Sequence, residues 1–158
     1  MPLQVVVQAA GVAPRLTAKD FRTELARSPA LKALLDRCVY VALAQRATSA
    51  GCLRFHHIGP RLARWLLMSR DRAHAPTFFM THEFLASMRG VRRVGVTAAA
   101  GELQRNGFIK YFRGQVHATD RKGLEGAACT CCESDLQAYA TQFPVPARKV
   151  LDIDALAV

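Results

Sequence analysis

The stretch from Thr81 to Asn106 constrains the fold of this chain most, because its pattern predicts two short helices joined by a tight turn. Thr81 is suited to cap the first helix, since its hydroxyl can accept a backbone N–H of the first turn. Gly90 is suited to end that helix, because glycine adopts a left-handed backbone without a Cβ clash. Apolar residues of the second helix recur at i, i+3, i+4 and i+7, which predicts one buried face: Val96, Ala99, Ala100 and Leu103.

The opposite face of the second helix carries the residues that point to a function. They are Arg92, Arg93, Val94, Thr97 and Ala98, and the same face continues to Arg105. Cations at the start of a helix oppose its dipole, so we expect an external partner to compensate them. Phosphates and guanine edges in a DNA major groove would do so, and we predict a DNA-binding helix-turn-helix with Thr81 among its contacts. An ordinary helical hairpin in a core is the alternative. The one departure from the motif is Arg89, where a buried aliphatic residue is usual.

A β-hairpin is predicted directly after these helices. It covers Phe108–Thr119 and turns at Arg113-Gly114. A hairpin in this position is a wing, from which Lys110 and Arg113 are predicted to reach phosphates, with His117 as a further candidate. Such contacts position a protein on DNA without reading its sequence. The alternative is a hairpin that only covers the core.

The charge of the chain favours a polyanionic partner. The net charge is +10 and the pI is about 10.0. Residues 54–126 hold 13 Lys and Arg against 5 Asp and Glu, so the surplus concentrates around the predicted DNA-binding part. A solvated basic surface is the alternative. With 51% hydrophobic residues, the 158-residue chain is able to form one moderate domain, or a small domain plus an oligomerising element.

A long helix is predicted upstream of this part. Ser28 is suited to its N-cap and Pro29 to its first turn, and the helix runs to about Arg54. One seam along it repeats every seven residues, apolar in its first half and polar in its second. The seam consists of Leu31, Cys38, Gln45 and Cys52, with Leu34, Val41 and Thr48 between them. It favours a parallel homodimer through residues 29–54, and the alternative is a long helix packed on its own domain.

The other predicted elements are short. They are a strand at Leu3–Gln8, a helix over Thr17–Arg27 capped by Thr17, a helix over Arg61–Arg70, a polar loop at Asp71–Pro76, a strand at Thr77–Met80 and a helical turn at Leu136–Tyr139. The 61–70 helix is expected to bury Leu62, Trp65 and Leu66. No apolar run approaches the ~18 residues of a membrane span, so no membrane partner is expected.

Five cysteines, and no visible signal peptide in Met1–Gly11, suggest reduced thiols and a cytoplasmic location. Cys129, Cys131 and Cys132 are close, but C-x-C-C without a second ligand cluster is a poor zinc signature, so neither a metal site nor a cofactor is predicted. His56 and His57 are interpreted as facing solvent or a helix junction. No paired carboxylates, nucleophile–base arrangement or phosphate-binding glycine loop indicates an enzyme.

Four segments carry a family resemblance. They are R-L-A-R-W-L-L at 61–67, T-H-E-F-L-A-S-M-R-G-V-R-R-V at 81–94, N-G-F-I at 106–109 and D-R-K-G-L-E at 120–125. In this order they resemble the Crp–Fnr superfamily of bacterial transcription regulators. The resemblance spans roughly residues 3–132, and its 61–125 portion is the specific part. It implies a ligand-sensing β-roll, a dimerising helix and a winged helix-turn-helix that binds a DNA palindrome, with RNA polymerase as a further candidate partner.

The resemblance implies that Arg93 contacts guanine, as the recognition-helix arginine of the family does. Val94 stands where many members have an acidic base-reading residue, and Ala98 where some have a second arginine. Base reading is therefore expected to depend on Arg93, whose bidentate contact would give about 1–3 kcal/mol of discrimination. Arg92 replaces the usual serine cap, which is expected to weaken that helix end by about 1 kcal/mol. Leu3–Gln8 resembles the last strand of the β-roll, and the rest of the roll is not visible in the sequence. No effector site is therefore expected. The chain would then be a truncated gene product or a natural sensorless variant.

The sequence thus predicts a mainly α protein with a small β component, in which a long dimerisation helix precedes a winged helix-turn-helix domain. The predicted parts are a β-roll remnant at 1–27, the dimerisation helix at 28–55, the winged helix-turn-helix at 56–126 and a tail at 127–158. The predicted function is a homodimeric transcription regulator that reads a pseudo-palindromic site. The alternatives are a sensorless module that heterodimerises with full-length relatives and antagonises them, and a cysteine-based redox or metal sensor.

Overall fold

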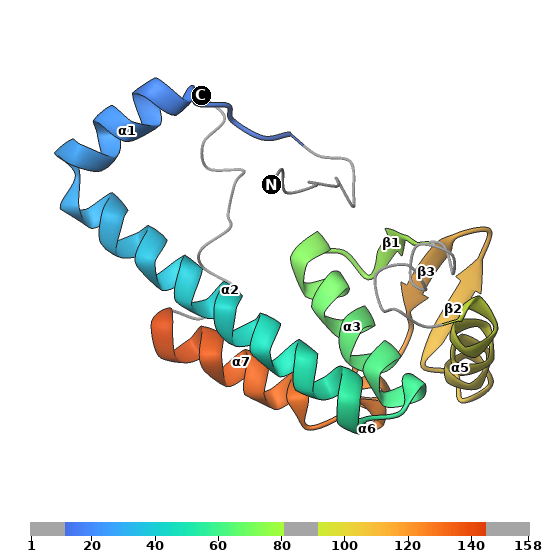
Figure 1. Cartoon of the computed structure of the whole chain (residues 1–158). Helices are drawn as coiled ribbons and strands as arrows, with labels where there is room; N and C mark the ends of the chain where they lie inside the picture. Colours follow the sequence, from blue (N-terminus) through green and yellow to red (C-terminus); the bar gives the residue numbers. More distant parts are fainter. Residues whose placement is uncertain (1–11, 81–91, 145–158) are drawn as a thin grey trace. The chain divides into compact units, whose positions relative to one another are not determined.

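The computed structural model describes residues 12–80 and 92–144 (Figure 1). Their elements are α1 (Ala18–Arg27), α2 (Pro29–Phe55), α3 (Ile58–Ala73), β1 (Thr77–Phe79), α5 (Arg93–Arg105), β2 (Ile109–Phe112), β3 (Gln115–Ala118), α6 (Arg121–Ala127) and α7 (Cys131–Gln142). The predicted fold class, mainly α with a small sheet, is confirmed. The predicted strand at Leu3–Gln8 and the predicted helix that starts at Thr81 and ends at Gly90 lie outside the described residues. No described helix is both long and apolar enough to cross a membrane.

The chain divides into two compact units. Of the described residues, the first unit holds 12–15, 52–80 and 92–129, and the second holds 16–51 and 130–144. The first unit therefore contains the end of α2 and every element from α3 to α6. The second contains α1, most of α2 and α7.

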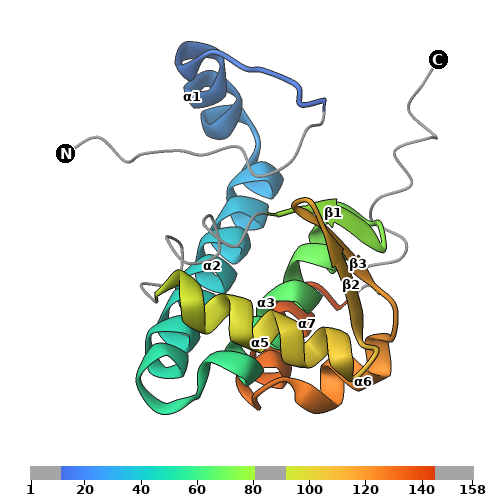
Figure 2. The same ribbon diagram turned by 90° about the vertical axis from the view of Figure 1, so that its right-hand side faces the viewer.

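Helix α3 is the centre of the first unit, because α5, α6 and β1 all pack against it (Figure 2). Leu62, Trp65 and Leu66 are buried, as predicted. Two arginines of the same helix are buried as well: Arg61 is 7% exposed and Arg64 is fully buried. Arginine is among the residues least often found inside a protein. The helix is thus covered on more sides than its apolar pattern alone indicates.

The structure corrects the predicted bounds of this helix. It begins at Ile58 rather than Arg61, and Pro60 lies in its first turn, where a missing backbone N–H costs nothing. It continues to Ala73, so the predicted loop at Asp71–Pro76 is wrong for its first three residues. His74 ends the helix in the left-handed conformation with a φ of 49°. Asp71 is thereby placed on the last turn of α3.

The three-stranded antiparallel sheet has the order β1-β3-β2. Its hairpin turns at Arg113 and Gly114, as predicted, with φ values of 47° and 84° and Phe112 paired to Gln115. Two consecutive positive φ values match the type I′ turn that suits the twist of a two-residue hairpin. Gly114 takes this conformation without strain, whereas Arg113 is a less usual choice. The predicted strand at Thr77–Met80 is confirmed as β1, which pairs with β3.

The caps predicted for the first two helices are confirmed. The Thr17 hydroxyl accepts the N–H of Asp20 at 3.1 Å and starts α1. The Ser28 hydroxyl accepts the N–H of Leu31 at 3.2 Å and starts α2, with Pro29 as its first residue. Both caps satisfy first-turn donors that have no partner within the helix.

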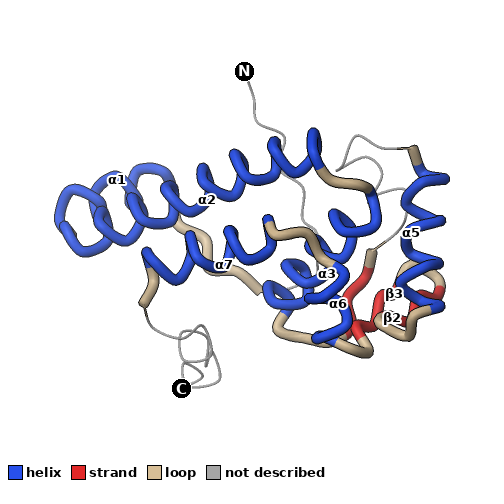
Figure 3. The backbone as a smooth tube through the Cα atoms, turned by 90° about the horizontal axis from the view of Figure 1, so that it is seen from below, coloured by secondary structure: helices blue, strands red, loops and turns tan. Residues whose placement is uncertain are grey.

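In the second unit, α7 runs alongside α2 (Figure 3). The Arg37 guanidinium of α2 lies 5.8 Å from the centre of the Phe143 ring, just beyond the end of α7. Helix α7 covers Cys131–Gln142, so the prediction of a single helical turn at Leu136–Tyr139 was too short. Its apolar residues are too few for a clear periodic stripe, which explains why the pattern did not reveal it.

The predicted seam of α2 is only partly at the surface. Val41 is 6% exposed and Cys52 is fully buried within the chain, so neither position is open to a second copy. A different stripe with heptad spacing is exposed on α2, and it consists of Tyr40, Leu43, Ala47 and Ala50. Tyr40 is 54% and Leu43 is 65% exposed, which leaves large apolar side chains in water.

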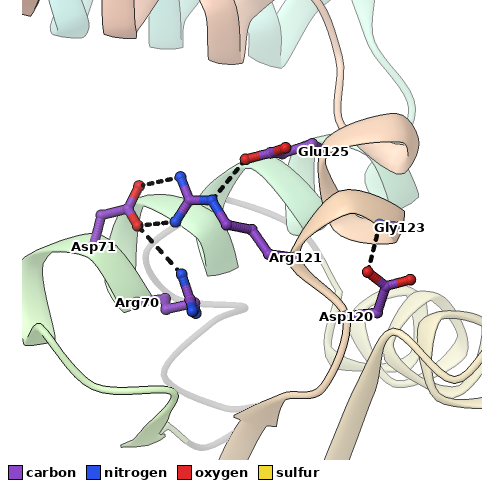
Figure 4. A network of polar contacts seen from close by, with 6 residues as sticks. All are labelled: Arg70, Asp71, Asp120, Arg121, Gly123 and Glu125. Atoms are coloured by element: carbon purple, nitrogen blue, oxygen red, sulfur yellow. Dashed lines mark hydrogen bonds and ion pairs between the residues drawn. The ribbon is translucent and has the colours of Figure 1, made fainter.

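Helix α6 is fastened to α3 by a network of polar contacts (Figure 4). The Asp120 carboxylate caps α6 by accepting the N–H of Gly123 at 3.0 Å. The Arg121 guanidinium donates to both carboxylate oxygens of Asp71, one of them at 3.1 Å, and to Glu125 at 2.7 Å. The hydrogen bond to Asp71 raises the pKa of Arg121 above its usual value, against a smaller opposing effect of burial. The segment 120–125 therefore starts a helix and ties it to the last turn of α3.

Candidate nucleic-acid interface

Helix α5 is held in place by its small apolar face. Val96, Ala99, Ala100 and Leu103 are between 3% and 6% exposed, so the predicted stripe is confirmed. This face packs against α3 and β2. A Cβ added at Gly95 would lie 2.8 Å from Cδ1 of Ile58 in α3, so glycine permits the close approach of the two helices.

The end of α5 fixes where the hairpin begins. Gly107 donates its N–H to the carbonyl of Gln104, and Phe108 donates to the carbonyl of Leu103, both at 3.0 Å. With Gly107 at a φ of 75°, this is a Schellman motif, and the predicted helix end at Asn106-Gly107 is confirmed. The chain then enters β2 within two residues, which places the hairpin next to α5 (Figures 1 and 2).

The opposite face of α5 is open to solvent. The five predicted residues nearest its start are exposed, namely Arg92, Arg93, Val94, Thr97 and Ala98, and so is Arg105 near its end. Val94 is 78% exposed, which is high for a β-branched apolar side chain. The Thr97 hydroxyl donates to the carbonyl of Arg93 at 3.1 Å and so remains on the helix surface. The structure therefore brings these five residues together on one exposed face.

The first turn of α5 is electropositive. Arg92 is its N-cap in an extended conformation, and its side chain makes no capping hydrogen bond. No acidic residue lies in the first turn, which starts with Arg93. Backbone N–H groups without helical partners, the positive end of the helix dipole and two guanidinium groups thus share one end of the helix. Such an end is suited to an anionic ligand.

The hairpin presents two exposed cations. Lys110 lies on β2, and Arg113 lies at the tip, 5.1 Å from the centre of the Phe112 ring. Phe112 is itself 68% exposed, so this stacked pair projects from the tip. His117 differs, because it is half-buried on β3 and its Nδ1 shares a 2.7 Å hydrogen bond with the Thr77 hydroxyl. The hydrogen bond between His117 and Thr77 stabilises the pairing of β1 with β3. Thr81, the remaining predicted contact residue, lies outside the described residues.

Sequence reasoning missed several residues that position the interface. A Cβ added at Gly123 would lie 2.4 Å from the Phe108 ring, so this glycine lets α6 meet the start of the hairpin. The Asp71–Arg121 pair joins residues 50 positions apart, and no local pattern indicates such a pairing. A signal for Asp120 was present, because aspartate is among the residues preferred at a helix N-cap.

Helices packed around α3 and an antiparallel sheet that ends in a basic hairpin are the arrangement expected of a helix-turn-helix domain with a wing. Residues 60–127 match the Crp-like helix-turn-helix domain as a protein family. This match supports the expected relation to Crp-type regulators at the level of the DNA-binding domain, over less than half of the chain.

The comparison with solved structures includes the catabolite activator protein of Thermus thermophilus, which is 24% identical with a TM-score of 0.37. The alignment covers 72% of this chain and 53% of that protein, so the chain spans about half of its length. A comparison with curated proteins gave no significant match.

Proposed function

We propose that this chain is a DNA-binding transcription regulator whose helix α5 enters the major groove. One observation carries the proposal: the first turn of α5 exposes two arginines on a helix whose opposite face is buried. This helix lies within the segment that matches a Crp-like helix-turn-helix domain. An α-helix fits the width of the major groove, and its N-terminal residues are the ones that reach base edges in such motifs.

Arg93 is the proposed base-reading residue. Its planar guanidinium can donate two hydrogen bonds to O6 and N7 of one guanine. Val94, exposed beside it, is suited to contact a thymine methyl group. Thr97 and Ala98 lie one turn further along the same exposed face, where a short side chain lets the helix approach the groove closely.

The hairpin is proposed to hold the DNA backbone. Lys110 and Arg113 are exposed cations on the strand and turn that follow α5, and phosphate is the anion that duplex DNA presents along its length. His117 is not included, because it is half-buried and hydrogen-bonded to Thr77 within the sheet. The hairpin contacts would strengthen binding to any sequence alike.

We further propose that two copies act together through α2. The exposed stripe of Tyr40, Leu43, Ala47 and Ala50 has the spacing of a coiled-coil seam, and Leu43 in it is 65% exposed. A second copy of the same stripe would remove these side chains from water. A two-fold dimer would place two α5 helices in successive major grooves about 34 Å apart.

Selection of bound duplexes from a random pool, followed by sedimentation of the complex, tests this proposal. The expected result is an enriched inverted repeat with half-sites about one helical turn apart and two chains per duplex. Enrichment of a single half-site with one chain per duplex would remove the dimer and leave the DNA-binding proposal. Failure to enrich any sequence would overturn sequence-specific binding itself.

A further inference from the structure

Three potential metal-ligand atoms converge in the first unit, where α2 ends and α3 begins. They are the Sγ atoms of Cys52 and Cys129 and a ring nitrogen of His56, which all lie within 4.8 Å of one another. Cys52 is fully buried and Cys129 is 8% exposed, while His56 is half-buried. We propose that these residues bind a thiophilic divalent cation, with Zn²⁺ as the expected ion.

The distances suit this chemistry. Zn–S bonds of about 2.3 Å and Zn–N bonds of about 2.0 Å at tetrahedral angles place ligand atoms about 3.5–3.8 Å apart. The Sγ atoms of Cys52 and Cys129 are 3.5 Å apart. A disulfide would require about 2.05 Å, so the two sulfurs stand at the separation of co-ligands. A buried cysteine pair alone would be ordinary core packing, and the converging imidazole is what distinguishes this site.

Backbone hydrogen bonds position the three ligand residues relative to one another. Cys52 and His56 are four residues apart, and the N–H of His56 donates to the carbonyl of Cys52 at 3.2 Å, so both project to one side at the end of α2. Cys129 follows α6, and its N–H donates to the carbonyl of Pro60 in the first turn of α3 at 3.4 Å. Residues 77 positions apart are thus anchored to the same junction between α2 and α3.

Binding would fasten the two ends of the first unit to each other. The cation replaces the protons of the two thiols, so two H⁺ are released for each Zn²⁺ bound, and the neutral imidazole donates a lone pair. A fourth tetrahedral position is left for water or a further thiolate, and Cys131 is the next cysteine in the sequence after Cys129. The sequence pattern missed the site because Cys52 at the end of α2 and His56 just after it are far from Cys129 in the sequence.

Titration of the full-length, chelator-treated protein with Co²⁺ under a non-thiol reductant tests the proposal, because Co²⁺ bound to thiolates has a characteristic absorption. We expect one Co²⁺ per chain, displaced by Zn²⁺, and a melting temperature that rises with Zn²⁺ concentration. Cys52→Ser and His56→Asn should each weaken Co²⁺ binding by at least about 100-fold. Loss of a group that only orients a metal ligand costs at most about this much, so loss of a ligand itself should cost more.

Matched variants separate this site from incidental binding. Cys38→Ser removes an exposed thiol of the same helix, and His57→Asn removes an exposed imidazole next to His56; both should leave binding unchanged. Circular dichroism confirms that each variant is folded. Co²⁺ binding that is absent in the folded wild-type protein, or that survives in folded His56→Asn and Cys52→Ser, would overturn the proposal. Loss of binding in the control variants to the same extent would also overturn it.

Discussion

Arginines occupy both α3 and the start of α5, but their surroundings are opposite. Arg64 is fully buried in α3, whereas Arg92 and Arg93 are exposed at the start of α5. The difference comes from the neighbours: α5, α6 and β1 surround α3, while α5 is covered along one stripe only. Packing, rather than residue type, therefore decides which arginines of this basic chain are available to a ligand.

The largest effect on stability is expected at the covered arginine. Arg64→Ala removes a fully buried side chain, so it leaves a cavity and removes the packing of a long aliphatic stem. We expect the free energy of unfolding to fall by about 3 kcal/mol, measured by urea denaturation. Arg105→Ala, at an exposed position of α5, should change it by no more than about 0.5 kcal/mol. Equal effects of the two substitutions would contradict the contrast drawn between the helices.

The same contrast between covered and open positions can be tested within α6. A Cβ at Gly123 would lie 2.4 Å from the Phe108 ring and 2.6 Å from the Asp120 carboxylate that caps the helix, whereas a Cβ at Gly126 meets no atom within 4 Å. Gly123→Ala should lower the free energy of unfolding by about 2 kcal/mol through overpacking. Gly126→Ala should leave it unchanged or raise it by up to about 1 kcal/mol, because alanine favours the helix. Thermal and urea unfolding of both variants measure the difference.

A smaller effect is expected from the pair that ties α6 to α3. Asp71→Asn removes a charge partner of Arg121, but both side chains are 38% exposed, so solvent screening limits the loss to about 1 kcal/mol. The raised pKa of Arg121 means that its contribution is present at every pH below the unfolded pKa and is lost only in strongly alkaline solution. The difference between wild type and variant should therefore be flat from about pH 6 to pH 9 and should shrink with added salt. A difference that disappears within this pH range would show that another group is responsible.

Local patterns in the sequence predicted much of this fold. The caps at Thr17 and Ser28, the buried stripe of α5 and the turn at Arg113-Gly114 each depend on residues within one or two helical turns, and all are confirmed. The features that were missed depend on long-range packing. Three such features depend on segments that are far apart in the sequence, so no local period reveals them. They are the burial of Arg64, the contact between Asp71 and Arg121, and the approach of Cys52 to Cys129.

The candidate interface divides in the same way. The sequence placed the five residues at the start of α5 on one exposed face, because a helical period fixes which side chains share a side. The sequence could not show that His117 forms a hydrogen bond with Thr77, since that bond depends on the pairing of β1 with β3. The seam of α2 was placed on positions that include Val41 and Cys52, because periodicity identifies an apolar stripe without showing what covers it.

The most specific effect on DNA binding is expected at Arg93, which is exposed at the start of α5. The most direct test of the proposed base reading compares the affinity of Arg93→Ala, Arg105→Ala and Lys110→Ala for the selected duplex and for a scrambled one at the same salt concentration. The account predicts that Arg93→Ala loses about 1–3 kcal/mol more on the selected duplex than on the scrambled one. Lys110→Ala should lose the same amount of binding free energy on both duplexes. Arg105→Ala should leave the preference for the selected duplex over the scrambled one unchanged. An equal loss on the two duplexes for Arg93→Ala would contradict base reading by the start of α5.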